Sequence, residues 1–167
     1  MQLTLTRRGD YVVRAAIYLA RAYGDGGYRK IREVADEMAL PRSYTPQILN
    51  LLARAGLAEA RAGREGGYRL RRDPAQVSLR EVVEAADGPL RPDRCSLRGG
   101  PCRWEDMCAL HPAWEAATAA LIESLQATTL ASVAEVDAAL ASGRYPVPAS
   151  AHRLQTKRGA RSRSLPS

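Results

Sequence analysis

The sequence is poor in the residues and segments that several classes of protein require. It has three cysteines, an odd number that would leave one thiol over from any disulfide framework. No apolar run approaches the roughly 18 residues that cross a membrane, and the start, MQLTLTRRGD, has no apolar segment behind its charges. Neither of the two histidines belongs to a recognisable nucleophile or general-base arrangement. We therefore expect a cytoplasmic protein without a membrane segment, and not an enzyme.

Positive charge is concentrated at the two ends of the chain. Residues 1–72 contain 14 Lys or Arg and 7 Asp or Glu, residues 73–143 contain 5 and 11, and residues 144–167 contain 6 and none. The first part is therefore where a polyanion would bind. The last part is rich in Arg, Ser and Pro and has few large apolar side chains, so we expect a disordered basic tail.

The first part has the periodicity of three helices and a hairpin. One apolar helix face has Thr6 or Asp10 near its start, and a second begins at Ile31 and is halted by Pro41. A third helix, which Ser43 could cap, follows after about three residues and is stopped by Gly56. Two short amphipathic helices joined this tightly are typical of a helix-turn-helix. The segments LAEARA and YRLRR, separated by GREGG, then predict a β-hairpin, so the pattern indicates a winged helix.

The start of the third helix carries side chains that suit DNA reading. The first turn of a helix in the major groove contacts base edges, and here that turn holds Ser43, Tyr44, Thr45 and Gln47. Just upstream, Arg42 can hold a phosphate. Arginines of the hairpin would lie near the backbone or the minor groove; they are Arg61, Arg64 and Arg69. A merely solvated face is the alternative, but the charge coincides with a helix-turn-helix and a wing, which favours double-stranded DNA.

Three more helices are predicted in the second part. Ser78 and Glu81 form a capping box at the start of one helix. Pro112 suits the first position of a long helix that continues to about Ala127, and a last short helix is expected from Ser132. The predicted fold class is mainly α with a small β-hairpin: a winged helix-turn-helix DNA-binding domain and a long helix.

All three cysteines and one histidine lie within seventeen residues, CSLRGGPCRWEDMCALH. Cys95, Cys102 and Cys108 are separated by six and five residues, and His111 follows three positions after the last. Structural zinc sites use cysteines about two to four residues apart, so zinc is the second choice. Wider spacing on a glycine-containing loop lets thiolates surround an iron–sulfur cluster. A thiol switch without metal and ordinary free cysteines are the remaining alternatives.

The order of these elements resembles the Rrf2 family of bacterial transcription regulators. The most specific matches are SYTPQILNLLARAGL, the wing residues Gly66, Gly67 and Tyr68, the SLREVVEAADG helix and the cysteine loop, and the resemblance covers about residues 1–140. It implies a homodimer in which the long helix after the loop crosses its twin. Each subunit would present one winged helix to a DNA half-site, and cluster occupancy would change the affinity for DNA.

The resemblance implies two sets of cluster ligands. In members similar to IscR, three cysteines and a histidine hold a 2Fe–2S cluster, and CALH matches that ending, so the ligands would be Cys95, Cys102, Cys108 and His111. In members similar to NsrR, an aspartate from the partner's first helix is the fourth ligand of a 4Fe–4S cluster, and Asp10 in GDYVVR looks similar. The histidine set, and with it the 2Fe–2S cluster, is preferred.

The predicted function is a DNA-binding transcription regulator, and more specifically a repressor. Its affinity would be controlled by an iron–sulfur cluster that senses nitric oxide, redox state or iron–sulfur supply. The alternative is a winged-helix regulator with a zinc or cysteine thiol switch and no iron–sulfur cluster. Residues 1–72 would bind DNA, residues 73–143 would bind the cluster and dimerise, and residues 144–167 would form the tail.

Overall fold

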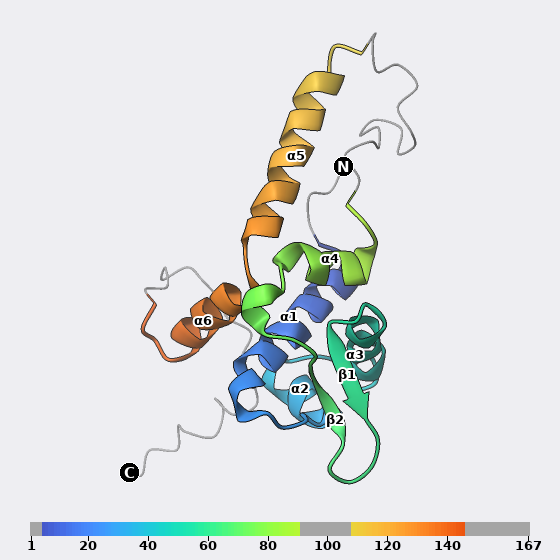
Figure 1. The fold of residues 1–167 in the computed structure, drawn as a ribbon, viewed down its shortest axis with the longest axis vertical. Coiled ribbons are helices and arrows are strands. Elements are labelled where there is room, and N and C mark those ends of the chain that lie inside the picture. Colours follow the sequence, from blue (N-terminus) through green and yellow to red (C-terminus); the bar gives the residue numbers. More distant parts are fainter. Residues whose placement is uncertain (1–4, 91–107, 146–167) are drawn as a thin grey trace, which may run out of the picture.

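The computed structural model describes residues 5–90 and 108–145, and within them the fold is mainly helical with one small hairpin, as predicted (Figure 1). In chain order the elements are α1 (Arg7–Arg21), the short 3-10 helix η1 (Tyr23–Asp25), α2 (Ile31–Glu37), α3 (Thr45–Arg54), β1 (Ala58–Arg61), β2 (Gly67–Leu70), the 3-10 helix η2 (Pro74–Gln76), α4 (Leu79–Asp87), α5 (His111–Ala127) and α6 (Leu130–Ala141). The predicted tail, apart from residues 144 and 145, and most of the cysteine loop lie outside the described residues.

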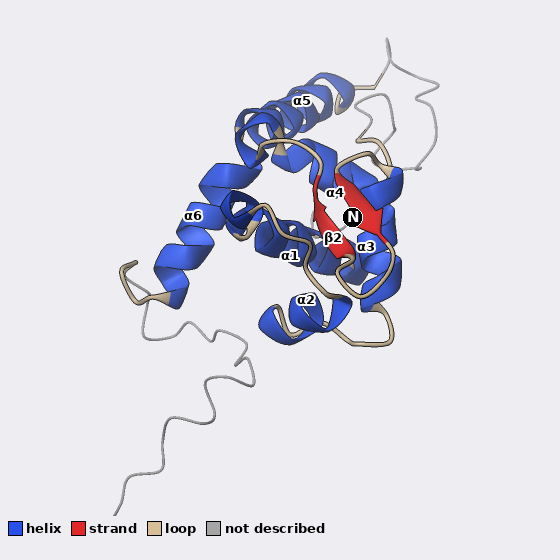
Figure 2. Ribbon diagram, turned by 60° about the horizontal axis from the view of Figure 1, so that its bottom comes forward, coloured by secondary structure: helices blue, strands red, loops and turns tan. Residues whose placement is uncertain are grey.

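Helix α1 is the centre of the fold. Of the two residues expected near its start, Thr6 is the cap: its hydroxyl oxygen accepts a hydrogen bond from the Gly9 backbone N–H at 3.0 Å. The helix is buried on more than one side, and α3, α4 and α6 all pack against it. Figure 2 shows α6 on one side of α1 and the hairpin with α3 on the other.

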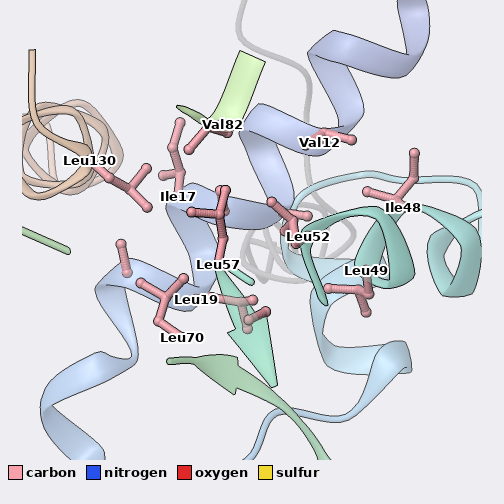
Figure 3. Close-up of a cluster of buried hydrophobic side chains, with 14 of the residues drawn as sticks. Val12, Ile17, Leu19, Ile48, Leu49, Leu52, Leu57, Leu70, Val82 and Leu130 are labelled. Atoms are coloured by element: carbon pink, nitrogen blue, oxygen red, sulfur yellow. The ribbon is translucent and has the colours of Figure 1, made fainter. Parts of the chain in front are cut away.

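One hydrophobic core joins these elements. Val12 and Leu19 of α1 meet Leu52 of α3, Val82 of α4 and Leu130 at the start of α6, and each of these side chains is at most 1% exposed (Figure 3). Burial of one such side chain contributes roughly 1.5–3 kcal/mol. Residues on both sides of the predicted boundary at 72 therefore share one core, so that boundary does not separate two independently packed units.

The helix-turn-helix is formed by α2 and α3, but its connection differs from the prediction. Seven residues, 38–44, separate the two helices instead of three. Ala39 adopts a positive φ of 53°, and the Pro41 carbonyl accepts hydrogen bonds from the backbone N–H groups of Tyr44 and Thr45 at 2.9 and 3.0 Å. The predicted cap, Ser43, is therefore wrong: Tyr44 occupies the cap position, and Ser43 lies exposed in the preceding turn.

The wing is a two-stranded antiparallel hairpin, as predicted, and its glycines are required by close backbone approach. A Cβ atom on Gly66 would lie 2.0 Å from the Arg61 carbonyl oxygen. One on Gly67, whose φ is +149°, would lie 2.3 Å from the Arg29 carbonyl oxygen. Arg29 approaches so closely because it pairs with Tyr68 through two backbone hydrogen bonds of 2.8 and 2.9 Å. The segment before α2 thus extends the hairpin by one short strand-like pairing.

The observed first residues of α4, α5 and α6 agree with the predicted ones to different degrees. The Ser78–Glu81 capping box of α4 is confirmed. Helix α5 begins at His111, so Pro112 is its second residue and not, as predicted from the preference of proline for the first turn, its first. The last helix begins at Leu130, because the Thr129 hydroxyl oxygen accepts from the Ser132 N–H at 3.2 Å; Ser132 as the start is therefore wrong.

Candidate nucleic-acid interface and metal-binding loop

The turn before α3 and the first turn of that helix present a polar surface. Arg42, Ser43 and Gln47 are exposed, and Tyr44 is half-buried with its ring edge-on to that of Tyr11, the centroids 6.2 Å apart. This anchors Tyr44 to α1, while the neighbouring side chains remain free to meet a groove of DNA. The structure therefore brings together four of the five residues predicted for this surface.

The fifth residue, Thr45, was predicted to contact DNA, and the structure contradicts this prediction. Its side chain is 0% exposed, and its hydroxyl donates a hydrogen bond to the Pro41 carbonyl at 2.9 Å. A fully buried side chain cannot reach a base edge, so Thr45 fixes the turn and does not read DNA. The helical spacing of Thr45, Ile48, Leu49 and Leu52, all of them buried, was the signal that places it on the inner face.

Arg42 is held in place by an acidic residue of α2. Its Nη2 lies 2.8 Å from Asp36 Oδ2, and the two side chains are 61% and 43% exposed. Exposed pairs of this kind contribute about 0–1 kcal/mol. A DNA phosphate could therefore take the place of Asp36 at low energetic cost, which keeps Arg42 suitable as a phosphate ligand.

The wing arginines are organised by Tyr28, which sequence reasoning missed. The guanidinium carbons of Arg69 and Arg61 lie 4.6 and 5.8 Å from the centre of the Tyr28 ring. Glu59 accepts hydrogen bonds from Arg69 Nε at 2.5 Å and from the Tyr28 hydroxyl at 2.9 Å, and these two bonds lower the pKa of Glu59. Arg61 stays exposed on the outer side of this cluster.

The tip of the wing is anchored to the residue that precedes α2. Lys30 Nζ donates a hydrogen bond to the Arg64 carbonyl, while the Arg64 side chain remains exposed. Together with the Arg29–Tyr68 pairing, this contact fixes the wing relative to the helix-turn-helix. No local sequence pattern marks Tyr28 or Lys30 for this role, because their partners lie some thirty residues away.

A hollow lies between the start of α1 and the turn before α3. It encloses about 610 Å³, and Arg7, Arg8, Tyr11 and Tyr44 are among its lining residues. Arg7 and Arg8 are exposed, and Arg8 Nη2 lies 3.7 Å from Asp87 Oδ1. Like the pair of Arg42 and Asp36, this exposed pair is weak, so a DNA phosphate could replace the carboxylate at either arginine.

Two of the predicted metal ligands lie in the described part of the chain, at the start of α5. Cys108 is half-buried, and its carbonyl accepts the His111 backbone N–H at 3.0 Å. The imidazole Nε2 of His111 lies 3.8 Å from Glu115 Oε2. A thiolate and an imidazole one turn apart are donors that suit iron or zinc. Cys95 and Cys102 lie outside the described residues.

The alternative ligand, Asp10, lies in the first turn of α1. Its carboxylate accepts a hydrogen bond from Arg14 Nε at 3.0 Å, and its side chain is 43% exposed. It is therefore accessible to a partner subunit. Within residues 5–90 and 108–145, no three His, Cys, Asp or Glu side chains gather into a metal site.

The polar turn before α3 and the glycine-bent, arginine-bearing hairpin define a winged-helix DNA-binding regulator. The chain belongs to the Rrf2 family: residues 5–136 match this family, which is described as an iron-dependent transcriptional regulator. The resemblance that the sequence motifs indicated is confirmed.

Individual relatives agree with this membership. IscR of Klebsiella pneumoniae, an HTH-type transcriptional regulator, is 29% identical over 95% of this chain and 93% of its own length. The structure is similar to that of T. potens IscR, with a TM-score of 0.66, 27% identity and coverage of 84% and 92% of the two chains. It is also similar to Staphylococcus aureus CymR, with a TM-score of 0.62, 26% identity and coverage of 78% and 97%. No helix in the described part of the chain is long and apolar enough to span a bilayer.

Proposed function

We propose that this transcription regulator is a cytoplasmic repressor that binds DNA as a homodimer, and that an iron–sulfur cluster controls its affinity for DNA. The observation that carries the proposal is the pairing of a winged helix with a cysteine loop placed directly between α4 and α5. Membership of a family described as iron-dependent supports it.

The proposed DNA contacts come from two elements. Ser43, Tyr44 and Gln47 would meet base edges in the major groove, and Arg42 would meet a phosphate. Arg61 and Arg64 would place the wing on the backbone or in the minor groove. All but the half-buried Tyr44 have exposed side chains.

Helix α5 supplies the argument for a homodimer. Among the described residues, none of its seventeen is buried, although its sequence contains only two carboxylates and no lysine or arginine. Leu121 is 42% exposed, and Figure 1 shows α5 extending away from the rest of the fold. A long helix of this composition gains stability when a second copy covers it. The first helix of each subunit would then be able to approach the cysteine loop of the other.

Cys95, Cys102, Cys108 and His111 would hold the cluster, with a 2Fe–2S core preferred, and Asp10 of the partner subunit is the alternative fourth ligand. A bound cluster supplies a centre that nitric oxide, oxidants or a shortage of iron and sulfide can alter. Soft thiolates and an imidazole are suitable donors. The free N–H groups at the start of α5 favour the negative charge of the thiolates.

The chain connects this loop to the DNA-binding surface through α4. Its last residue, Asp87, accepts hydrogen bonds from the Thr6 hydroxyl at 2.6 Å and the Thr6 backbone N–H at 3.3 Å. Helix α4 also packs against both α1 and α3. A change in the loop would move α4 and thereby shift the start of α1 and the recognition helix. A coupling of about 1–3 kcal/mol would change the affinity for DNA roughly 5- to 150-fold.

The second candidate is a regulator with a zinc or cysteine thiol switch and no cluster. The similarity to Staphylococcus aureus CymR, which has also been solved in an oxidized form at 25% identity to this chain, favours it. Three arginines are interleaved with the cysteines in the sequence and would favour thiolates in either case: Arg94, Arg98 and Arg103.

Anaerobic purification of the full chain tests the proposal. We expect brown protein with iron, acid-labile sulfide and visible absorption, and loss of all three in Cys108→Ser. His111→Ala should lose the cluster and Asp10→Ala should keep it, with Glu115→Ala as the matched control beside His111. The opposite result would make Asp10 the fourth ligand. Colourless protein with stoichiometric zinc, or without metal, would reject the cluster and favour the second candidate.

A further inference from the structure

A second cavity lies on the side of the wing that faces the end of α1. It has a volume of about 450 Å³ and is bounded by the end of α1, the glycine-rich segment after it and both strands of the hairpin. Volumes of about 300–1,000 Å³ are usual for sites that bind small molecules. Among the described residues, those of the recognition turn do not contribute to its lining.

The polar lining of this cavity has an excess of positive charge. Three arginines line it: Arg29, Arg69 and Arg71. Arg29 is paired with Asp25, and Arg69 is paired with Glu59. The Arg71 side chain makes no hydrogen bond or ion pair among the described residues and interacts with Glu59 only through its charge, so its hydrogen-bond donors remain available. Arg29 and Arg69 repel Arg71 only weakly, because the charge of each is offset by its own carboxylate partner.

An unsatisfied donor on Arg29 provides an independent observation. Its Nε is buried and has no hydrogen-bond partner in the described part of the chain. A buried donor without a partner costs about 1–3 kcal/mol, more when it is charged. Such a donor is therefore expected to have an acceptor from outside the chain, which is either water or a bound molecule.

The rest of the lining is apolar or consists of glycine. Leu19, Ala22 and Leu70 contribute hydrocarbon surface. Gly24, Gly26 and Gly27 bring the backbone of the segment after α1 to the edge of the cavity. A side chain added at Gly24 or Gly26 would meet no atom within 4 Å, so space beside these two residues is open.

We propose that this cavity binds a small organic oxyanion, a carboxylate or phosphate with a short apolar part, as an effector of the regulator. Arg71 and Arg29 would hold the anionic group, and Leu19, Ala22 and Leu70 would cover the apolar part. Because the cavity adjoins both strands of the wing, an occupant would stiffen the hairpin that carries Arg61 and Arg64. The inference does not depend on the iron–sulfur cluster.

The same oxyanion chemistry could come from a DNA phosphate, and the apolar lining favours the free molecule. The experiment separates the two sources. Full-length protein labelled with ¹⁵N is titrated with inorganic phosphate and with phenyl phosphate at constant ionic strength, and the amide signals of Gly24, Gly26 and Gly27 are followed. Salt dependence of duplex DNA binding is measured in parallel. Arg71→Gln is the test variant, and Arg54→Gln removes one exposed charge outside the cavity as the control.

We expect saturable shifts of the three glycine signals, at least threefold tighter binding of phenyl phosphate, and about tenfold weaker binding in Arg71→Gln but not in Arg54→Gln. Arg29→Lys keeps the charge but loses Nε, and should also weaken binding. If DNA is the source, free phosphates give no saturable shift. Arg71→Gln then reduces the slope of log K against log salt concentration by about 0.9 per subunit, which is more than the control does. Absence of both effects, or equal effects in Arg71→Gln and Arg54→Gln, overturns the proposal.

Discussion

Replacement of Gly67 by alanine should disable the wing without unfolding the protein. The new Cβ atom would lie 2.3 Å from the Arg29 carbonyl oxygen, which is backbone and cannot rotate away. The φ of +149° adds strain of about 1–3 kcal/mol for a residue other than glycine. Relief of the contact requires loss of the two Arg29–Tyr68 hydrogen bonds, each contributing about 0.5–1.5 kcal/mol. The local cost is therefore about 2–6 kcal/mol.

Loss of the wing should weaken DNA binding, because the wing positions Arg61 and Arg64. If Arg61 and Arg64 each contact one phosphate, their loss reduces the slope of log K against log salt concentration by about 1.8 per subunit, which is about 3.6 for the proposed homodimer. Fluorescence anisotropy with a random-sequence duplex at several salt concentrations measures this slope. Circular dichroism checks that the helices remain.

Gly24→Ala is the matched control. It adds the same methyl group at a position where no other atom lies within 4 Å and where φ is not positive. It should bind DNA with an unchanged slope. Equal slopes for Gly67→Ala and the original protein would refute the role given to the wing and to its contact with Arg29.

Two further predictions concern stability. Thr45→Val should lower the free energy of unfolding by about 1 kcal/mol, because the hydrogen bond from the buried Thr45 hydroxyl to the Pro41 carbonyl is lost. It should leave the salt slope unchanged; a changed slope would restore Thr45 as a DNA contact. Burial alone would raise the pKa of Glu81, but hydrogen bonds from the backbone of Ser78 and from Arg72 outweigh it and lower the pKa below 4.5. The ionised Glu81 therefore stabilises the fold above about pH 4.5, and this contribution is lost as the pH falls through its folded pKa. Urea unfolding between pH 3 and 7 should show a weaker pH dependence in Glu81→Gln, and identical dependence in both proteins would contradict the assignment.

Features that depend on neighbouring residues could be predicted from the sequence. The Ser78–Glu81 capping box needs only four residues, and the hairpin is marked by glycines within a single short segment. The amphipathic stripes of α2 and α3 indicated the helix-turn-helix for the same reason. Fold class and family could therefore be predicted without coordinates.

Features that depend on distant partners could not be predicted. Lys30 and Tyr28 contact a wing that lies about thirty residues further along the chain. The strand-like bridge between Ser78 and Thr129 joins residues some fifty positions apart. The start of α6 itself depends on a local cap by Thr129, which the choice of Ser132 overlooked. Thr45 is a different case, because its helical spacing placed it inside and only its polar side chain suggested otherwise. The cluster ligands and the cluster type stay predictions.

The bridge between Ser78 and Thr129 has a consequence for the cysteine segment. Leu79 N–H donates to the Thr128 carbonyl at 2.8 Å, and Leu130 N–H donates to the Val77 carbonyl at 2.7 Å. These bonds close residues 79–128 into a loop whose two roots are fastened together. Lengthening such a loop costs little, about 0.6 kcal/mol for a doubling. Insertions between the cysteines should therefore leave the winged helix folded, because the bonds of Leu79 and Leu130 still close the loop.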